Sequence, residues 1–157
     1  MPVIVAFNLA QLGITGYALW RGGGPERAVA ALLLAASLAT IATPTIDRVS
    51  YFTVFYAVMW IDLALFLGLA AVAAFADRFW PMWLAALQLV ALGAHGVRAI
   101  DPTLWAAAYW LVTTKIAYPM LLLLFAGTWR HRRRLAAGLP EWSWSHGGRG
   151  DEGVHPS

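Results

Sequence analysis

Two opposite charges, Asp62 and Lys115, stand deep inside long apolar stretches of the chain. At 1.5 Å of helix rise per residue, Asp62 lies about 15 Å and Lys115 about 18 Å from the same end of their stretches. A lone charge at such depth in a hydrocarbon medium is costly, so we expect the two side chains to pair. The pair has two interpretations, an ion pair that fixes helix packing or a group that handles an ion, a proton or a ligand. In a third interpretation the two side chains do not pair, and each extends separately to the membrane surface.

Three uncharged or weakly basic polar residues accompany this pair at similar depth. Gln11 lies about 13 Å, Gln88 about 16 Å and His95 about 6 Å from that same end. Gln88 and His95 are seven residues apart, which places them on one side of a helix. Polar faces turned toward lipid would be wasteful, so we expect one shared polar pocket that opens toward the outside. Its ligand-binding residues are predicted to be Asp62, Lys115, His95, Gln88 and Gln11.

Other chemistry has little support from the residue types. A single histidine in the apolar region, His95, cannot supply a bis-histidine haem site or a zinc site with three protein ligands. The chain has no cysteine, which excludes thiolate metal sites and cysteine nucleophiles. Ser37 and Ser50 have no histidine nearby in the sequence, so a hydrolase triad is not indicated. We expect no metal site, leave any cofactor unassigned, and favour a non-enzymatic protein.

The composition tells where these residues must lie. Of the 157 residues, 61% are hydrophobic and 12% are charged, whereas an ordinary soluble domain has about 25% charged residues. Four of the 11 basic residues fall in one run, at Arg130, Arg132, Arg133 and Arg134. Without this run the chain would be slightly acidic, so nucleic acid is not an expected partner. The composition indicates a membrane protein.

Five apolar stretches are long enough to cross a bilayer, which takes about 20 helical residues. The predicted helices span residues 2–20, 28–46, 52–76, 79–99 and 103–129, and glycine, proline or charge separates them. Backbone in lipid must form its hydrogen bonds internally, so these stretches are expected to be helices. The sequence therefore predicts an all-α bundle of five transmembrane helices over residues 1–134. The tail, 135–157, is rich in Gly, Ser, Pro and Trp and is predicted to be disordered.

The arginine run predicts the orientation of the bundle. Basic residues near the ends of membrane spans favour the cytoplasmic side, so the C-terminus is expected in the cytoplasm. Counting back over five crossings places the N-terminus outside. The predicted location of the protein is the inner membrane of a bacterium. The run at Arg130, Arg132, Arg133 and Arg134 is first a topology anchor, and an anionic lipid is its secondary expected partner.

Together these features predict a small multi-pass membrane protein, and they favour a non-enzymatic role. It would bind or conduct a small ligand or ion, or act as an accessory subunit of a larger membrane complex or homo-oligomer, through the pocket around Asp62 and Lys115. One alternative is a lipid-modifying membrane enzyme with His95 or Asp62 as acid or base. Another is a protein that binds a quinone, carotenoid or retinoid-type cofactor against its aromatic faces.

Overall fold

The described residues of the computed structural model form an all-helical protein. The structure describes residues 2–44, 51–100, 115–138 and 144, with side chains from residues 5–44, 56–100, 115–138 and 144. The helices are α1 (Pro2–Arg21), α2 (Gly24–Ala42), α3 (Tyr51–Phe75), α4 (Trp80–Ile100) and α6 (Ala117–Ala136). The only β-type pairing in this described part is an isolated bridge between Ala76 and Trp144.

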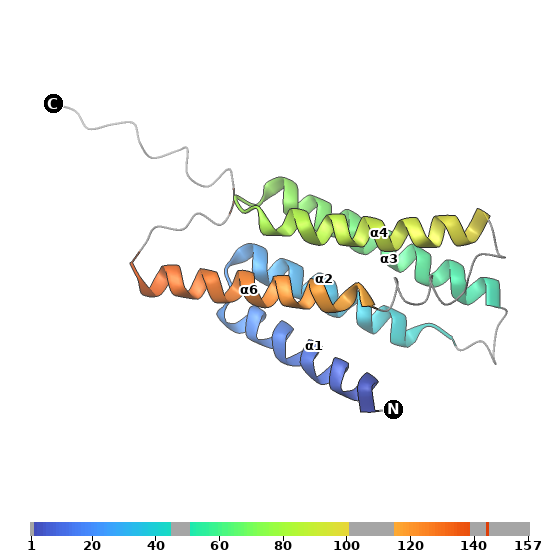
Figure 1. Ribbon diagram of the computed structural model, residues 1–157, viewed down its shortest axis with the longest axis horizontal. Coiled ribbons are helices and arrows are strands. Elements are labelled where there is room, and N and C mark those ends of the chain that lie inside the picture. Colours follow the sequence, from blue (N-terminus) through green and yellow to red (C-terminus); the bar gives the residue numbers. More distant parts are fainter. Residues whose placement is uncertain (1, 45–50, 101–114, 139–143, 145–157) are drawn as a thin grey trace.

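The helices lie roughly along one long axis (Figure 1). Helix α3 packs along α4, α1 along α2 and α6 along α1, while α2 also contacts α3. The α1–α2 turn, the α3–α4 turn and the C-terminal half of α6 lie at the same end of the molecule, at the left in Figure 1. Three segments that are far apart in the sequence thus meet there.

Three of the described helices are long and apolar enough to cross a membrane. They are α2, the part of α3 from Tyr56 to Phe75, and α4. Many of their large apolar side chains are exposed, for example Leu67 at 58% and Leu89 at 53%. An apolar surface of this kind is suited to lipid contact, and it supports the interpretation as a membrane protein.

Helices α1, α3 and α4 begin and end within about one residue of the predicted bounds, but α2 does not. It begins at Gly24 rather than Ala28 and ends at Ala42 rather than Ile46. Pro25 lies in its first turn, where the fixed backbone angle of proline suits a helix start. Thr43 is already extended, as expected for a residue before proline. The prediction treated the glycine- and charge-rich start of α2 as a loop, and this was wrong.

The C-terminal helix differs most from its prediction. The predicted span 103–129 begins among residues 101–114, which lie outside the described residues, and α6 continues past Trp129 to Ala136. Arginine, leucine and alanine are good helix formers, so charge alone does not end the helix. Gly138, with a φ of 67°, follows the last turn and provides the left-handed residue common there. The arginine run is thus helical, and the helix includes the first two residues of the predicted tail, Leu135 and Ala136.

A regular seam joins α3 to α4. The buried residues of α4 are spaced alternately by three and four, at Pro81, Leu84, Gln88, Ala91 and His95. The facing residues of α3 and its following turn, Leu65, Leu69, Val72 and Ala76, show the same spacing and are buried. This spacing places one continuous stripe on each helix and allows close antiparallel packing. A polar residue can therefore lie in this interface only if its position falls on one of the two stripes.

Candidate functional site

Asp62 is the centre of a polar cluster between α3 and α4. The Nε2 amide of Gln88 donates a hydrogen bond of 3.0 Å to Asp62 Oδ1. The Nε2 atom of His95 lies 2.8 Å from Asp62 Oδ2. Each oxygen of the carboxylate therefore has its own partner on α4, and the three residues form the Asp62 cluster.

The seam explains why these three residues meet. Asp62 lies three residues before Leu65 and so extends the buried stripe of α3 by one position. Antiparallel pairing from the α3–α4 turn brings Asp62 level with Ala91, between Gln88 and His95. Gln88 and His95, which lie on either side of Ala91 in the buried stripe of α4, supply the polar atoms.

Burial within the Asp62 cluster is uneven. The side chain of His95 is 2% exposed, whereas 24% of the Asp62 side chain is exposed. Gln88 is buried, at 2%. The imidazole and the amide thus hold the carboxylate from the protein side, while part of the Asp62 side chain remains exposed.

The cluster has the atoms for proton exchange. When Asp62 is ionised, His95 must donate from Nε2, and when Asp62 is protonated, the same nitrogen can accept. A proton can therefore lie on either residue of the short contact without changing the net charge of the pair. Loss of that proton leaves one negative charge on Asp62, which accepts hydrogen bonds from the Gln88 amide and from Nε2–H of a neutral His95.

The structure does not bring Lys115 to Asp62. Between these two described residues there is no ion pair, because Asp62 is joined to His95 and Lys115 lies with its Nζ 5.4 Å from the ring centroid of Tyr118. Lys115 is exposed. Helix α3 packs mainly against α4, whereas α6 packs mainly against α1, so matching depth did not mean adjacent position. The predicted partner of Asp62 is corrected from Lys115 to His95.

Gln11 is also separate from the Asp62 cluster. Its amide donates a hydrogen bond to Ser37 Oγ of α2, and its backbone carbonyl accepts one of 2.6 Å from Thr15 Oγ1. Gln11 and Thr15 are both buried at the α1–α2 interface. The five predicted ligand-binding residues thus lie in three places, and only Asp62, Gln88 and His95 contact one another.

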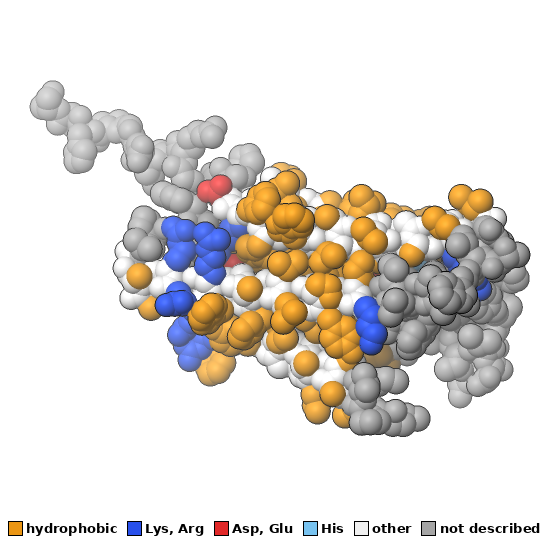
Figure 2. All heavy atoms as spheres, in the orientation of Figure 1, with side chains coloured by type: hydrophobic (Ala, Val, Ile, Leu, Met, Phe, Trp, Pro, Cys, Tyr) orange, Lys and Arg blue, Asp and Glu red, His pale blue; other side chains and the backbone are white. Residues whose placement is uncertain are grey.

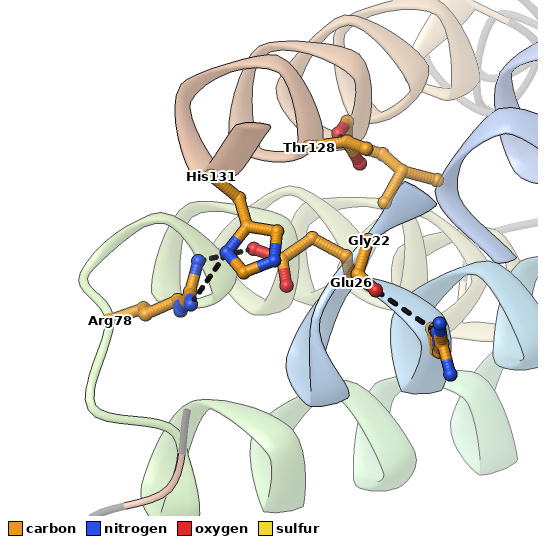
Figure 3. A network of polar contacts seen from close by, with 7 residues as sticks. Gly22, Glu26, Arg78, Thr128 and His131 are labelled. Atoms are coloured by element: carbon orange, nitrogen blue, oxygen red, sulfur yellow. Dashed lines mark hydrogen bonds and ion pairs between the residues drawn. The ribbon is translucent and has the colours of Figure 1, made fainter. Parts of the chain in front are cut away.

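A second polar cluster, which the sequence did not predict, lies at the end where the turns meet (Figure 3). Arg78 of the α3–α4 turn donates from Nη1 to Glu26 Oε1 of α2 over 2.7 Å. The Nη2 atom of Arg78 lies 3.2 Å from His131 Nδ1 of α6. We call these three residues the Glu26 cluster, and it joins three segments of the chain.

The Glu26 cluster is almost completely buried. The side chain of Glu26 is 0% exposed and that of Arg78 is 8% exposed, and His131 is 7% exposed. Because a guanidinium only donates hydrogen bonds, Nδ1 of His131 must accept from Arg78. A proton on that nitrogen would break this contact and place two positive charges side by side.

Tight backbone packing closes this end of the molecule. A Cβ atom on Gly22 would overlap the carbonyl oxygen of Ala18 and would lie 2.6 Å from Cβ of Glu26. A Cβ atom on Gly23 would lie 3.0 Å from Glu26 Oε2 and 3.0 Å from Cε1 of His131. The glycines before α2 therefore allow the α1–α2 turn to close over the buried carboxylate.

The sequence held one signal for the missed histidine. Met120, Leu124 and Gly127 are buried on α6, and the same spacing of four, three and four reaches His131. A helix extended through the arginine run would have placed His131 on the core face. Glu26 and Arg78 resemble ordinary loop charges in the sequence, and no comparable pattern marks them.

Among the residues that the structure describes, no group of three or more histidine, aspartate, glutamate or cysteine side chains could hold a metal ion. The chain matches no known protein family, and no curated protein or solved structure is detectably similar to it. The candidate site therefore rests on its own geometry.

Proposed function

We propose that this chain is a multi-pass protein of a bacterial inner membrane that binds and releases a proton at the Asp62 cluster. In this proposal five helices cross the bilayer, with the N-terminus outside and the C-terminus in the cytoplasm. The three apolar helices support the membrane location, and the arginine run of α6 supports the orientation. The Asp62 cluster then lies toward the outside and the Glu26 cluster toward the cytoplasm.

One observation carries the proposal: the basic partner of Asp62 is an imidazole, at 2.8 Å. Imidazole gains and loses a proton near neutral pH, whereas guanidinium stays charged. A carboxylate held by an imidazole and an amide has no permanent charge to balance it in an apolar medium. Taking up a proton removes that imbalance, so proton binding is the chemistry that this arrangement favours.

In this proposal the partly exposed carboxylate is the point at which the proton enters. About a quarter of the Asp62 side chain is exposed, while His95 is enclosed. A proton arriving from the outer side reaches the carboxylate first and passes to Nε2 of His95 along the existing contact. The cluster thus acts as a proton-binding group, and no bond other than those to hydrogen forms or breaks.

Infrared difference spectroscopy on the full-length protein in lipid nanodiscs tests the proposal directly. Acidification should produce a carboxylic acid C=O band from Asp62 that is absent in Asp62→Asn. The band should shift in frequency in His95→Gln, because the carboxyl group loses this hydrogen-bond partner. Gln11→Leu, which alters the polar contact at the α1–α2 interface, is the matched control and should keep the band unchanged. A band that persists in Asp62→Asn would refute the proposal.

A flux measurement distinguishes binding from conduction. Proteoliposomes that enclose a pH-sensitive dye are given a potassium diffusion potential, and the internal pH is followed. A protein that conducts protons should acidify the interior faster than empty liposomes, and Asp62→Asn should abolish the difference. Equal rates in wild type and empty liposomes would limit the function to proton binding.

The same contact also supports a second function, a lipid-modifying enzyme. A carboxylate and a histidine in contact can act together in general acid–base catalysis. In this case the partly exposed Asp62 would take a proton from a lipid hydroxyl or from water, and His95 would orient it. Incubating the purified protein with phospholipid and analysing the lipids by mass spectrometry should reveal a product that His95→Gln does not form.

A further inference from the structure

We propose that the exposed face of α6 binds the headgroup of an anionic phospholipid at Trp129, Arg130 and Arg133. The site is separate from the Asp62 cluster and does not depend on proton binding. Only some arginines of the run belong to this site, because successive side chains of a helix point in different directions.

A shallow groove of about 430 Å³ marks the site. It is lined by Ala126, Trp129, Arg130, Arg133 and Arg134. Arg130, Arg133 and Arg134 are spaced by three and four residues, which places them on one face of the helix. Arg132 of the same run does not line the groove. Three of the four arginines in the run therefore converge on one groove.

The groove continues into an apolar stripe. Leu122 is 65% exposed, Phe125 is 45% exposed and Trp129 is 51% exposed. Along α6 the exposed surface thus changes from apolar to cationic within about one turn at Trp129. The arginines gather beside apolar side chains at one end of the molecule (Figure 2). An amphiphile with an acidic head and hydrocarbon tails matches this order.

Trp129 positions the side chain of Arg133 to bind the headgroup. The guanidinium of Arg133 lies 5.0 Å from the ring centroid of Trp129. Stacking on an indole restricts the side chain of arginine and keeps its donors at the rim of the groove. The guanidinium fork matches two oxygens of a phosphate, and charge complementarity selects a lipid with net negative charge. A zwitterionic lipid carries its own ammonium and gains less.

Native mass spectrometry of the full-length protein in detergent tests the site. The protein is titrated with phosphatidylglycerol and, separately, with phosphatidylcholine of the same acyl chains. Wild type should retain phosphatidylglycerol in preference to phosphatidylcholine. Arg133→Gln should lower phosphatidylglycerol binding about fivefold, the expected effect of one basic residue at a membrane surface. Arg132→Gln is the matched control, with the same change of charge, and should bind as wild type does.

Each other outcome contradicts the proposal. Equal losses in Arg133→Gln and Arg132→Gln would show a general attraction to charge rather than a site. Equal retention of the two lipids would show that the acyl chains alone bind. Displacement of phosphatidylglycerol by an equal concentration of glycerol phosphate would show a phosphate site without lipid contact. A change in subunit number in Arg133→Gln, without a change in lipid, would assign the face to a second copy of the chain. Circular dichroism of both variants checks that they fold.

Discussion

The two polar clusters between the helices contain the same two residue types, a carboxylate and a histidine, but differ in what neutralises the carboxylate. Glu26 is fully buried and paired with the guanidinium of Arg78. Asp62 is about one quarter exposed and paired with the imidazole of His95. A permanent cation holds a carboxylate ionised and in place, whereas a titratable one can share a proton with it. The identity of the basic partner thus separates a structural ion pair from a candidate proton site.

The clusters also differ in what they connect. The Glu26 cluster joins α2, the α3–α4 turn and α6, and each of its contacts spans more than 50 residues of sequence. The Asp62 cluster lies within one helix pair that an apolar seam already holds together. We therefore expect a disrupted Glu26 cluster to cost stability and a disrupted Asp62 cluster to cost mainly function.

The largest effect is expected from Arg78→Met. Removing the guanidinium leaves the Glu26 carboxylate buried without its counter-charge, and such changes cost about 3–5 kcal/mol. Thermal or denaturant unfolding in detergent, followed by circular dichroism, measures the loss. Asp77→Asn alters the exposed neighbouring residue and should stay within about 0.5 kcal/mol. Equal stability of Arg78→Met and wild type would remove the structural role of the Glu26 cluster.

A backbone change at the same end should come next. Gly22→Ala places a methyl group against the Ala18 carbonyl and Glu26, and overpacking of this kind costs about 1–3 kcal/mol. Gly13→Ala is the matched control, because a Cβ atom there meets nothing within 4 Å. Gly13 lies inside α1, so alanine should stabilise that helix by about 0.5–1 kcal/mol. Unfolding of both variants under the same conditions should therefore show shifts of opposite sign.

A smaller change in stability is expected at the other cluster. Asp62→Asn keeps an oxygen that can accept from Gln88 and removes a charge from an apolar region, so stability should change by no more than about 1 kcal/mol. The unfolding midpoint measures this. A loss as large as that of Arg78→Met would erase the distinction between the clusters and make Asp62 a structural residue.

The smallest effect is expected at an uncharged polar contact. Ser37→Ala removes the acceptor of the Gln11 amide, and interhelical hydrogen bonds in membranes contribute about 0.6 kcal/mol on average. The expected loss of unfolding free energy is of that order. This variant supplies the reference against which charge-dependent losses at Arg78 and Asp62 are judged.

Much of the fold could be predicted because it depends on local patterns. Apolar stretches of about 20 residues locate α1, α3 and α4 to within about one residue. The start of α2 and the end of α6 were missed because glycine, proline and arginine were taken as helix breaks. The end of α2 was predicted too late, because the helix was continued past Pro44. Proline suits a first helical turn, and an arginine-rich helix can continue beyond the apolar stretch.

The candidate site could be predicted only in part. Gln88 and His95 share a helix face by spacing, and this prediction is confirmed by their common contact with Asp62. Asp62 was paired with Lys115 because depth along a helix follows from counting residues. Which helices are neighbours does not follow from counting, and α4 rather than α6 lies beside that face of α3.

The sequence by itself determined that this chain is helical and rich in apolar surface, and it located charges inside that surface. These properties depend on composition and on periods of three and four residues, which the order of residues contains completely. Only the tertiary structure decided that Asp62 contacts His95 and that Glu26, Arg78 and His131 meet. Contacts between distant segments depend on which helix faces pack together. That arrangement depends on the combined free energy of all the helix interfaces and not on any one of them.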